Sequence, residues 1–320
     1  MKKPVWLILS LLLCAAARQG LCADSTGTGT AAFLKLPVDA RSGGMGEAVC
    51  GGAVGALALF QNPAGLAGNR GAGISFSHAL LVEDLSYDVL GAAIPFRKAG
   101  IIGVGAQYLK YGNFASFDNT GSGVGTLSPR DSAFSLGWGM NIAEDIMAGA
   151  GVKYIDSKIS GSAATTAMDL GLLVKLENMS VGFAAQNLGK GLKFNEETSP
   201  LPLNIKLGVD IPYQEEWRWA ADINFPNDGL VWVAAGGEYA FDLKPWTLLG
   251  RAGYNTAAWD TRELNGVSLG FGLANKNLTF DYAFRTMGML GSTHHLGISY
   301  KWPNKSVKQD RTPPLLLYWP

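Results

Sequence analysis

The feature that most constrains this chain is a series of about fourteen segments, each roughly ten residues long, in which apolar and polar side chains alternate. The clearest segment lies at 216–225. Alternation with period two places successive side chains on opposite faces of a strand, so the sequence predicts an all-β protein. The segments fall near residues 73–81, 86–96, 100–111, 131–143, 146–158, 166–176, 179–187, 203–211, 216–225, 230–241, 244–256, 265–275, 277–287 and 293–302.

The connections between these segments alternate in length. Short turns are marked by pairs such as Arg97-Lys98 and Glu144-Asp145, whereas 112–130, 159–165, 188–202 and 256–264 are longer. An even number of strands, with short turns at one end and long loops at the other, is typical of bacterial outer-membrane barrels. Closure also leaves no strand edge unpaired in lipid. The sequence therefore predicts an antiparallel transmembrane β-barrel at 73–302, with about fourteen strands.

One face of the strands is apolar and is expected to contact lipid. A Lys or Arg on that face at mid-depth would cost about 2–4 kcal/mol, so the charged face points into the barrel. Two interpretations of these inward charges stay open, a permeation path and a structural ladder of cross-strand ion pairs. The predicted lumen-facing charged residues are Lys206, Asp210, Arg218, Asp222, Arg251, Asp281 and Arg285.

Many predicted inward positions are small. Glycine there leaves room for a channel or for something packed against the wall, but glycine also relieves barrel curvature. Taken together, the inward glycines favour an occupied interior. They include Gly103, Gly105, Gly137, Gly139, Gly149, Gly151, Gly270 and Gly272.

The stretch 40–68 fits neither a strand pattern nor a membrane helix. Its longest apolar run, 51–60, is far shorter than the roughly 20 residues that a helix needs to cross hydrocarbon. Residues 24–72 are therefore predicted to be a short helical or irregular plug inside the barrel.

The two ends of the chain differ from the barrel. Residues 1–23 have the layout of a secretory signal peptide cleaved after Ala23, with an uncleaved anchor helix as the alternative. Cleavage would leave Cys50 as the remaining cysteine, which excludes an intramolecular disulfide and a cysteine-based metal site. The tail at 303–320 could dock on a partner or on the barrel mouth, and a non-native extension is an equal alternative.

Composition argues against several functions. The net charge is 0, so the chain has no basic surface for nucleic acid. The glycine-rich stretch 121–125 lacks the Gly-Lys-Ser/Thr ending of a phosphate loop. His294 and His295 are adjacent and would point to opposite faces of a strand, so they cannot ligate one metal together. We predict no enzymatic activity, no cofactor and no metal.

The segments 33–48 (FLKLPVDARSGGMGEA) and 60–67 (FQNPAGLA) resemble the start of the PorV/PorQ family, whose members are relatives of the FadL long-chain fatty-acid transporters. The resemblance implies a fourteen-stranded barrel and a hatch whose rearrangement opens a route for apolar ligands. The residues that would form this plug or hatch motif are Gly44, Met45, Gly46, Phe60, Asn62, Pro63, Ala64 and Gly65.

By the same resemblance, the first functional hypothesis is a component of protein export and surface attachment of the type IX kind. Its partners would be a secretion translocon or a cargo protein. The alternative is a FadL-like channel for long-chain fatty acids or other hydrophobic small molecules, with such a molecule, detergent or lipid in the lumen. Either version implies the outer membrane of a Gram-negative-type bacterium, contact with its lipid, and a periplasmic N-terminus.

Overall fold

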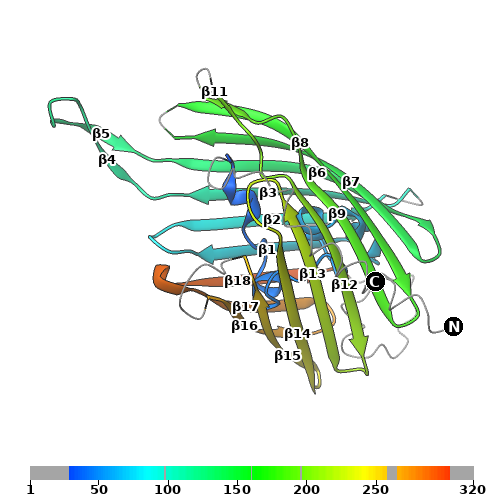
Figure 1. The fold of residues 1–320 in the computed structure, drawn as a ribbon. Helices are drawn as coiled ribbons and strands as arrows, with labels where there is room; N and C mark the ends of the chain where they lie inside the picture. Colours follow the sequence, from blue (N-terminus) through cyan, green and yellow to red (C-terminus); the bar gives the residue numbers. More distant parts are fainter. Residues whose placement is uncertain (1–28, 97–98, 160, 195–196, 258–264, 303–320) are drawn as a thin grey trace.

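The computed structural model describes residues 29–302, apart from 97–98, 160, 195–196 and 258–264 (Figure 1). The described residues form a closed antiparallel barrel of fourteen strands, which confirms the predicted fold class. No helix within them is long and apolar enough to cross a membrane. The barrel strands are β1 (Gly73–Leu80), β2 (Ser86–Pro95), β3 (Ile101–Lys110), β6 (Arg130–Ala143), β7 (Ile146–Lys158), β8 (Ser162–Leu176), β9 (Met179–Gly189), β12 (Asn204–Tyr213), β13 (Trp217–Pro226), β14 (Trp232–Leu243), β15 (Trp246–Asn255), β16 (Asn265–Ala274), β17 (Leu278–Met287) and β18 (Ser292–Lys301).

The strands follow one another around the barrel in chain order, and β1 closes it against β18. We call one end of the barrel the short-turn end, where the connections include 144–145, 177–178, 214–216, 244–245 and 275–277. The opposite end is the long-connection end. Its connections carry two extra hairpins, β4 (Phe114–Phe117) with β5 (Gly123–Leu127), and β10 (Leu192–Phe194) with β11 (Glu197–Ser199). Figure 1 shows the β4–β5 hairpin reaching beyond the other strands.

One predicted connection is shorter than expected. The sequence indicated a loop at 159–165, but β8 begins at Ser162, because Ser162–Thr166 pair with Lys158–Tyr154 of β7. These residues are mostly small and polar and lie at the long-connection end, where an apolar face is not needed. The hairpin therefore continues without the alternation that would have revealed it.

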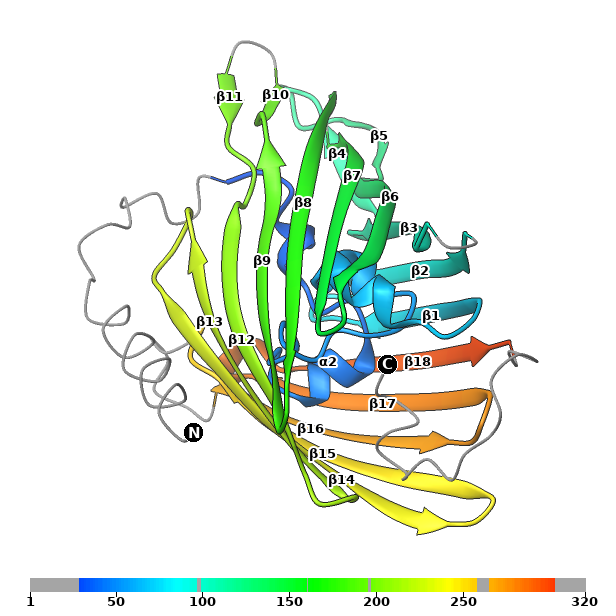
Figure 2. The same ribbon diagram turned by 90° about the vertical axis from the view of Figure 1, so that its right-hand side faces the viewer.

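The plug lies inside the ring of strands (Figure 2). Its elements are η1 (Ala32–Lys35), α2 (Ala40–Gly44), α3 (Ala58–Gln61) and η2 (Pro63–Gly68), and a further turn, η3 (Gly288–Leu290), joins β17 to β18. The plug spans the length of the barrel. Its first residues lie at the long-connection end, where the Thr30 amide donates to the Pro200 carbonyl over 3.0 Å. Its last residues join β1 at the short-turn end.

The predicted signal peptide at 1–23 and the tail at 303–320 lie outside the described residues, and so does the chain terminus that was predicted to be periplasmic. Large apolar side chains cover the outside of the barrel. Among the exposed ones are Phe76, Phe134, Trp138, Trp219, Phe271 and Phe280.

Candidate functional site

The Asn-Pro-Ala-Gly turn is the centre of the plug. Asn62 is fully buried and caps η2, since its Oδ1 accepts from the Ala64 amide over 3.2 Å and Pro63 occupies the first position of the turn. The Asn62 amide also donates to the Cys50 carbonyl at 3.0 Å and to the Leu172 carbonyl of β8 at 3.3 Å. The Asn62 side chain therefore links the η2 turn both to the preceding plug loop and to the barrel wall.

The predicted motif residues lie against different strands. Met45 is buried near β14 and β15, and Gly46 has a φ of 64°, which favours glycine. The Gly46 carbonyl accepts from Asn255 over 3.3 Å, while the Gly44 carbonyl accepts from Ser268 over 3.2 Å. Phe60 lies under β3, where a Cβ on Gly105 would meet its ring. A Cβ on Gly65 would overlap the Ala53 carbonyl, so this position has no room for a side chain.

Inward glycines surround the plug. Among the predicted inward glycines, a Cβ would collide with Leu66 at Gly103 and with Pro63 at Gly149, whereas at Gly270 it would make a tight contact of 3.3 Å with the Gly44 backbone. Gly272 differs, because a Cβ there would meet Asp281 and Arg251. Gly151 differs too, because its nearest neighbours are at ordinary contact distance. Occupancy by the plug accounts for most of these glycines. Further positions that would contact plug atoms are Gly91, Gly105, Gly137, Gly139, Gly171, Gly182, Gly208, Gly236 and Gly253.

The inner wall has a charged half, which we define as the inward face of β12–β17. The structure places Asp210, Arg218, Asp222 and Arg251 there as buried residues, and Lys206, Asp281 and Arg285 on the same face with partial burial. Four ion pairs join the described strands of this half to one another: Arg218–Asp210 and Arg218–Glu238, both at 3.8 Å, and Arg251–Asp281 and Arg251–Glu238, both at 2.6 Å.

The charged half also holds the plug. Asp222 does not pair with Lys206 within 4.0 Å, and one of its oxygens accepts from the backbone amides of Val49 and Cys50 over 2.9 and 2.8 Å. Arg41 of α2 lies 3.5 Å from Glu238, and Arg285 lies 2.6 Å from Glu47 of the plug. The inward charges are therefore mostly engaged with one another or with the plug.

Sequence reasoning missed three members of this network, Glu238, Arg41 and Glu47. Glu238 lies in the predicted strand 230–241 at the same parity as Ala234 and Gly236, so the alternation could have placed it inward. The positions of Arg41 and Glu47 depend on how the plug folds, for which the sequence carries no periodic signal. The structure also shows a buried pair on the other side of the barrel, Lys153–Asp169 at 2.7 Å.

The other half of the interior is mainly apolar, although it also holds buried Asp131 and the Lys153–Asp169 pair. We define the apolar half as the inward face of β1–β9 together with the connections above it. Phe33, Leu57, Leu59 and Leu66 of the plug belong to one cluster with this wall. Its wall and loop members are Ala79, Tyr87, Val89, Ala93, Ile101, Leu109, Ala133, Ile155, Ala163, Ala167, Leu192 and Leu201, with Leu81, Leu85, Tyr111 and Phe194 packed against them.

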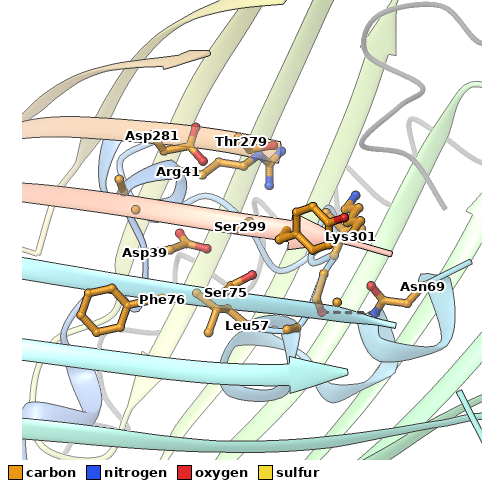
Figure 3. A pocket seen from close by; sticks show the side chains of 17 residues that line it. Asp39, Arg41, Leu57, Asn69, Ser75, Phe76, Thr279, Asp281, Ser299 and Lys301 are labelled. Atoms are coloured by element: carbon orange, nitrogen blue, oxygen red, sulfur yellow. Dashed lines mark hydrogen bonds between the residues drawn. The ribbon is translucent and has the colours of Figure 1, made fainter. Parts of the chain in front are cut away.

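A small cleft of about 70 Å³ separates the plug from β1, β17 and β18 near the short-turn end (Figure 3). Plug residues 39–41 and 54–57 line one side, and Ser75, Asp281 and Lys301 are among the wall residues on the other. Both polar and apolar residues line it. The cleft is a place where the plug and the wall are not in direct contact.

Cys50, on the plug, is the one cysteine among the residues that the structure describes, and its thiol is free. The residue is only 1% exposed. Burial raises the pKa of its thiol well above the ordinary value, and the nearby Asp222 carboxylate adds to the effect. Its side chain lies 3.8 Å from the Asn62 amide. The thiol is therefore protonated and unreactive while the plug is seated.

No family model matches the sequence, and no curated protein matches it. Solved structures do match. The Pseudomonas putida toluene transporter TodX is 15% identical with a TM-score of 0.52, over 81% of this chain and 95% of TodX. A Pseudomonas aeruginosa FadL homologue is 12% identical with a TM-score of 0.56, over 84% and 99% of the two chains.

The chain has the FadL-type barrel fold. A TodX deletion mutant, described as a monoaromatic hydrocarbon channel, gives the same result at 17% identity and a TM-score of 0.50, over 82% and 96% of the two chains. At these identities the similarity establishes the architecture alone. The similar proteins are described as a transporter, a channel and a FadL homologue, and none of these three descriptions names an enzyme or a secretion component. The resemblance to PorV/PorQ and the two functional hypotheses stay predictions.

Proposed function

We propose that this FadL-type barrel is an outer-membrane channel for hydrophobic small molecules. The observation that carries the proposal is the division of the interior. Along the apolar half, one continuous cluster runs from the connections at the long-connection end, through Leu192 and Leu109, to Phe33 and Leu57 of the plug. An apolar ligand entering along this cluster would exchange one apolar surface for another. The buried charges on the same wall would keep their own partners, since Lys153 pairs with Asp169 and Asp131 accepts from Tyr111 and Ser157.

The plug blocks this route in the structure, so transport requires part of it to move. The turn η1, which carries Phe33, makes few polar contacts with the wall, and one of them is the Lys35–Asp228 pair at 2.8 Å. Lys35 is about half exposed in that pair, and exposed ion pairs are worth only about 0–1 kcal/mol. We propose that ligand displaces η1 first and that the plug then separates from the wall at the cleft beside β1 and β18.

Uptake by cells tests the proposal. Cells that lack their own barrel for hydrophobic compounds would express this chain, and labelled toluene or a labelled long-chain fatty acid would be added. We expect uptake several-fold above that of the empty vector. Uptake equal to the vector for both compounds would contradict the channel function.

A crosslink tests the movement of the plug. A Cβ on Gly297 would lie 3.8 Å from the Cβ of Ala40, which is the mean separation in a disulfide. The double variant Ala40→Cys/Gly297→Cys should therefore close the cleft under oxidising conditions and abolish uptake, and reductant should restore it. The single variant Ala40→Cys is the matched control. Full uptake by the oxidised double variant would show that the plug need not part from β18.

A further inference from the structure

The outward face of the barrel is almost free of basic residues. Along the outward positions of the fourteen barrel strands, as far as the structure describes them, Lys or Arg occurs at Lys110, Arg130 and Lys158 and nowhere else. Their orientation follows from the register. Gly103 and Gly105 of β3 face the plug, so Lys110, at the opposite parity, faces outward. All three side chains are exposed.

These three cations form one row across adjacent strands. Lys110 of β3 lies directly opposite Arg130 of β6, and Arg130 lies directly opposite Lys158 of β7. Neighbouring strands are about 4.8 Å apart, so the row is about 10 Å wide. Like charges directly opposite each other destabilise a strand pair. Repulsion between the three cations therefore destabilises the barrel here, and a bound anion would offset that repulsion.

The acidic residues nearby do not supply that anion. Asp88 is on the outward face of β2, but it contacts His78 Nδ1 at 2.7 Å. Asp156 is one outward position below Lys158 and diagonal to Arg130. Among the described residues, no ion pair of 4.0 Å or shorter joins Asp156 or any of the three cations to another residue. One carboxylate beside three cations leaves the row with a net positive charge.

The row lies where the apolar belt ends. On the same face, Tyr108 is the next outward residue below Lys110, and Phe134 and Tyr154 lie two outward positions below Arg130 and Lys158. All three rings are exposed. Aromatic side chains of this kind mark the boundary between hydrocarbon and headgroups in barrels. The cations are thus at headgroup depth, at the long-connection end, which faces the outer leaflet in outer-membrane barrels.

We propose that Lys110, Arg130 and Lys158 bind the phosphate groups of lipid headgroups in the outer leaflet. The guanidinium of Arg130, central in the row, can hold a phosphate through two parallel hydrogen bonds, and the flanking lysines supply point charges. The site depends on the placement of the barrel in a membrane. It does not depend on what the channel carries, so it stands or falls separately from the transport experiments.

Lipid titration of the purified full chain in neutral detergent tests the site. The probes are lipid A with two phosphates, the same lipid after enzymatic removal of both phosphates, and inorganic phosphate, with binding followed by native mass spectrometry and by protein melting temperature. Each cation near an anionic surface is worth about fivefold in affinity, so Lys110→Gln/Arg130→Gln/Lys158→Gln should weaken binding of phosphorylated lipid A by about 100-fold. The unphosphorylated lipid should bind both proteins equally.

Two further variants make the result specific. Lys190→Gln/Lys193→Gln/Lys244→Gln removes three exposed cations that lie off the outward row, and it should bind like the unmodified protein. Lys110→Arg/Arg130→Lys/Lys158→Arg keeps the charges and should retain most of the affinity. If the triple glutamine variant does not migrate as a folded barrel on unboiled gels, Arg130→Gln alone should still weaken binding about fivefold.

Three outcomes would overturn the proposal. The first is unchanged affinity of the triple glutamine variant for phosphorylated lipid A. The second is an equal loss of affinity in the control variant, which would indicate nonspecific attraction. The third is inorganic phosphate that binds the row as tightly as the lipid does, which would identify an anion site without lipid specificity.

Discussion

The two halves of the barrel interior hold the same plug by different physical means. On the apolar half, Phe33, Leu57 and Leu66 pack against aliphatic and aromatic side chains of β1–β9. On the charged half, Arg41, Glu47 and the amides of Val49 and Cys50 are engaged by Glu238, Arg285 and Asp222. Apolar contacts are not directional and tolerate repacking, whereas a buried ion pair that loses its geometry leaves charges without compensation. The charged half should therefore fix the position of the plug, and the apolar half should be able to yield.

The largest effect is expected where the charged half loses its central anion. Glu238 lies within 4.0 Å of Arg41, Arg218 and Arg251. Glu238→Gln would leave the buried guanidinium groups of Arg218 and Arg251 and the partly buried one of Arg41 short of one negative charge. Removal of one partner from a buried pair typically costs about 3–5 kcal/mol. Urea unfolding in detergent, followed by tryptophan fluorescence, measures the free energy.

Ile155→Val is the matched variant in the apolar half. Ile155 is fully buried in the apolar cluster, and removing one methyl group typically costs about 0.5–1.5 kcal/mol. If both variants lost the same small amount of stability, the distinction between a fixing half and a yielding half would be wrong.

The second prediction compares two glycines on one face of one strand. At Gly149 of β7 a Cβ would overlap the Pro63 backbone, whereas at Gly151 the nearest atoms are 3.6 and 3.7 Å away. Gly149→Ala should therefore destabilise the seated plug by about 1–3 kcal/mol through overpacking. Gly151→Ala should be close to neutral. Equal melting temperatures for the two variants would mean that the plug is not packed on β7 as described.

These comparisons also show how much the sequence could predict. The strands and their lipid-facing sides follow from period two, because a transmembrane strand has to expose apolar side chains at every second residue. For the same reason, individual residues such as Asp210 and Arg251 could be assigned to the inward face. The sequence could not predict which partner each inward charged side chain contacts. Whether Asp222 binds Lys206 or the plug backbone depends on where an irregular segment of about 40 residues lies, and such a segment has no period to read.

The plug could be recognised from its sequence motif, but the wall residues that the motif contacts could not. Asn62-Pro63-Ala64-Gly65 marks a capped turn in any context, since Asn caps and Pro favours the first turn. That Asn62 also reaches the Leu172 carbonyl of β8 depends on the absence of a side chain at Gly171, on a strand more than 100 residues away. Contacts between a motif and a distant small residue leave no local signal in either segment.

The third prediction concerns Asn62, which lies on the boundary between the two halves. Asn62→Ala removes the cap of η2 and two donated hydrogen bonds, and loss of such a cap typically costs about 0.5–2 kcal/mol. The loss should appear as a lower urea midpoint and as faster alkylation of Cys50, whose carbonyl loses its partner. Asn69→Ala is the matched control, because the Asn69 side chain donates to the carbonyls of Gly55 and Leu66, which both belong to the plug. Equal alkylation rates in the two variants would contradict the role of Asn62.

The smallest effect is a pH dependence that reports on Cys50. Its pKa in the folded protein is raised above the ordinary 9.0, first by burial and second by Asp222. A group whose folded pKa is raised adds stability below its unfolded pKa and loses it as the pH rises, since the unfolded thiol ionises first. Between pH 8 and pH 10 the urea midpoint should therefore fall further for the unmodified protein than for Cys50→Ala. Parallel pH profiles would mean that water reaches the thiol, and that the charged half does not seal the plug at this position.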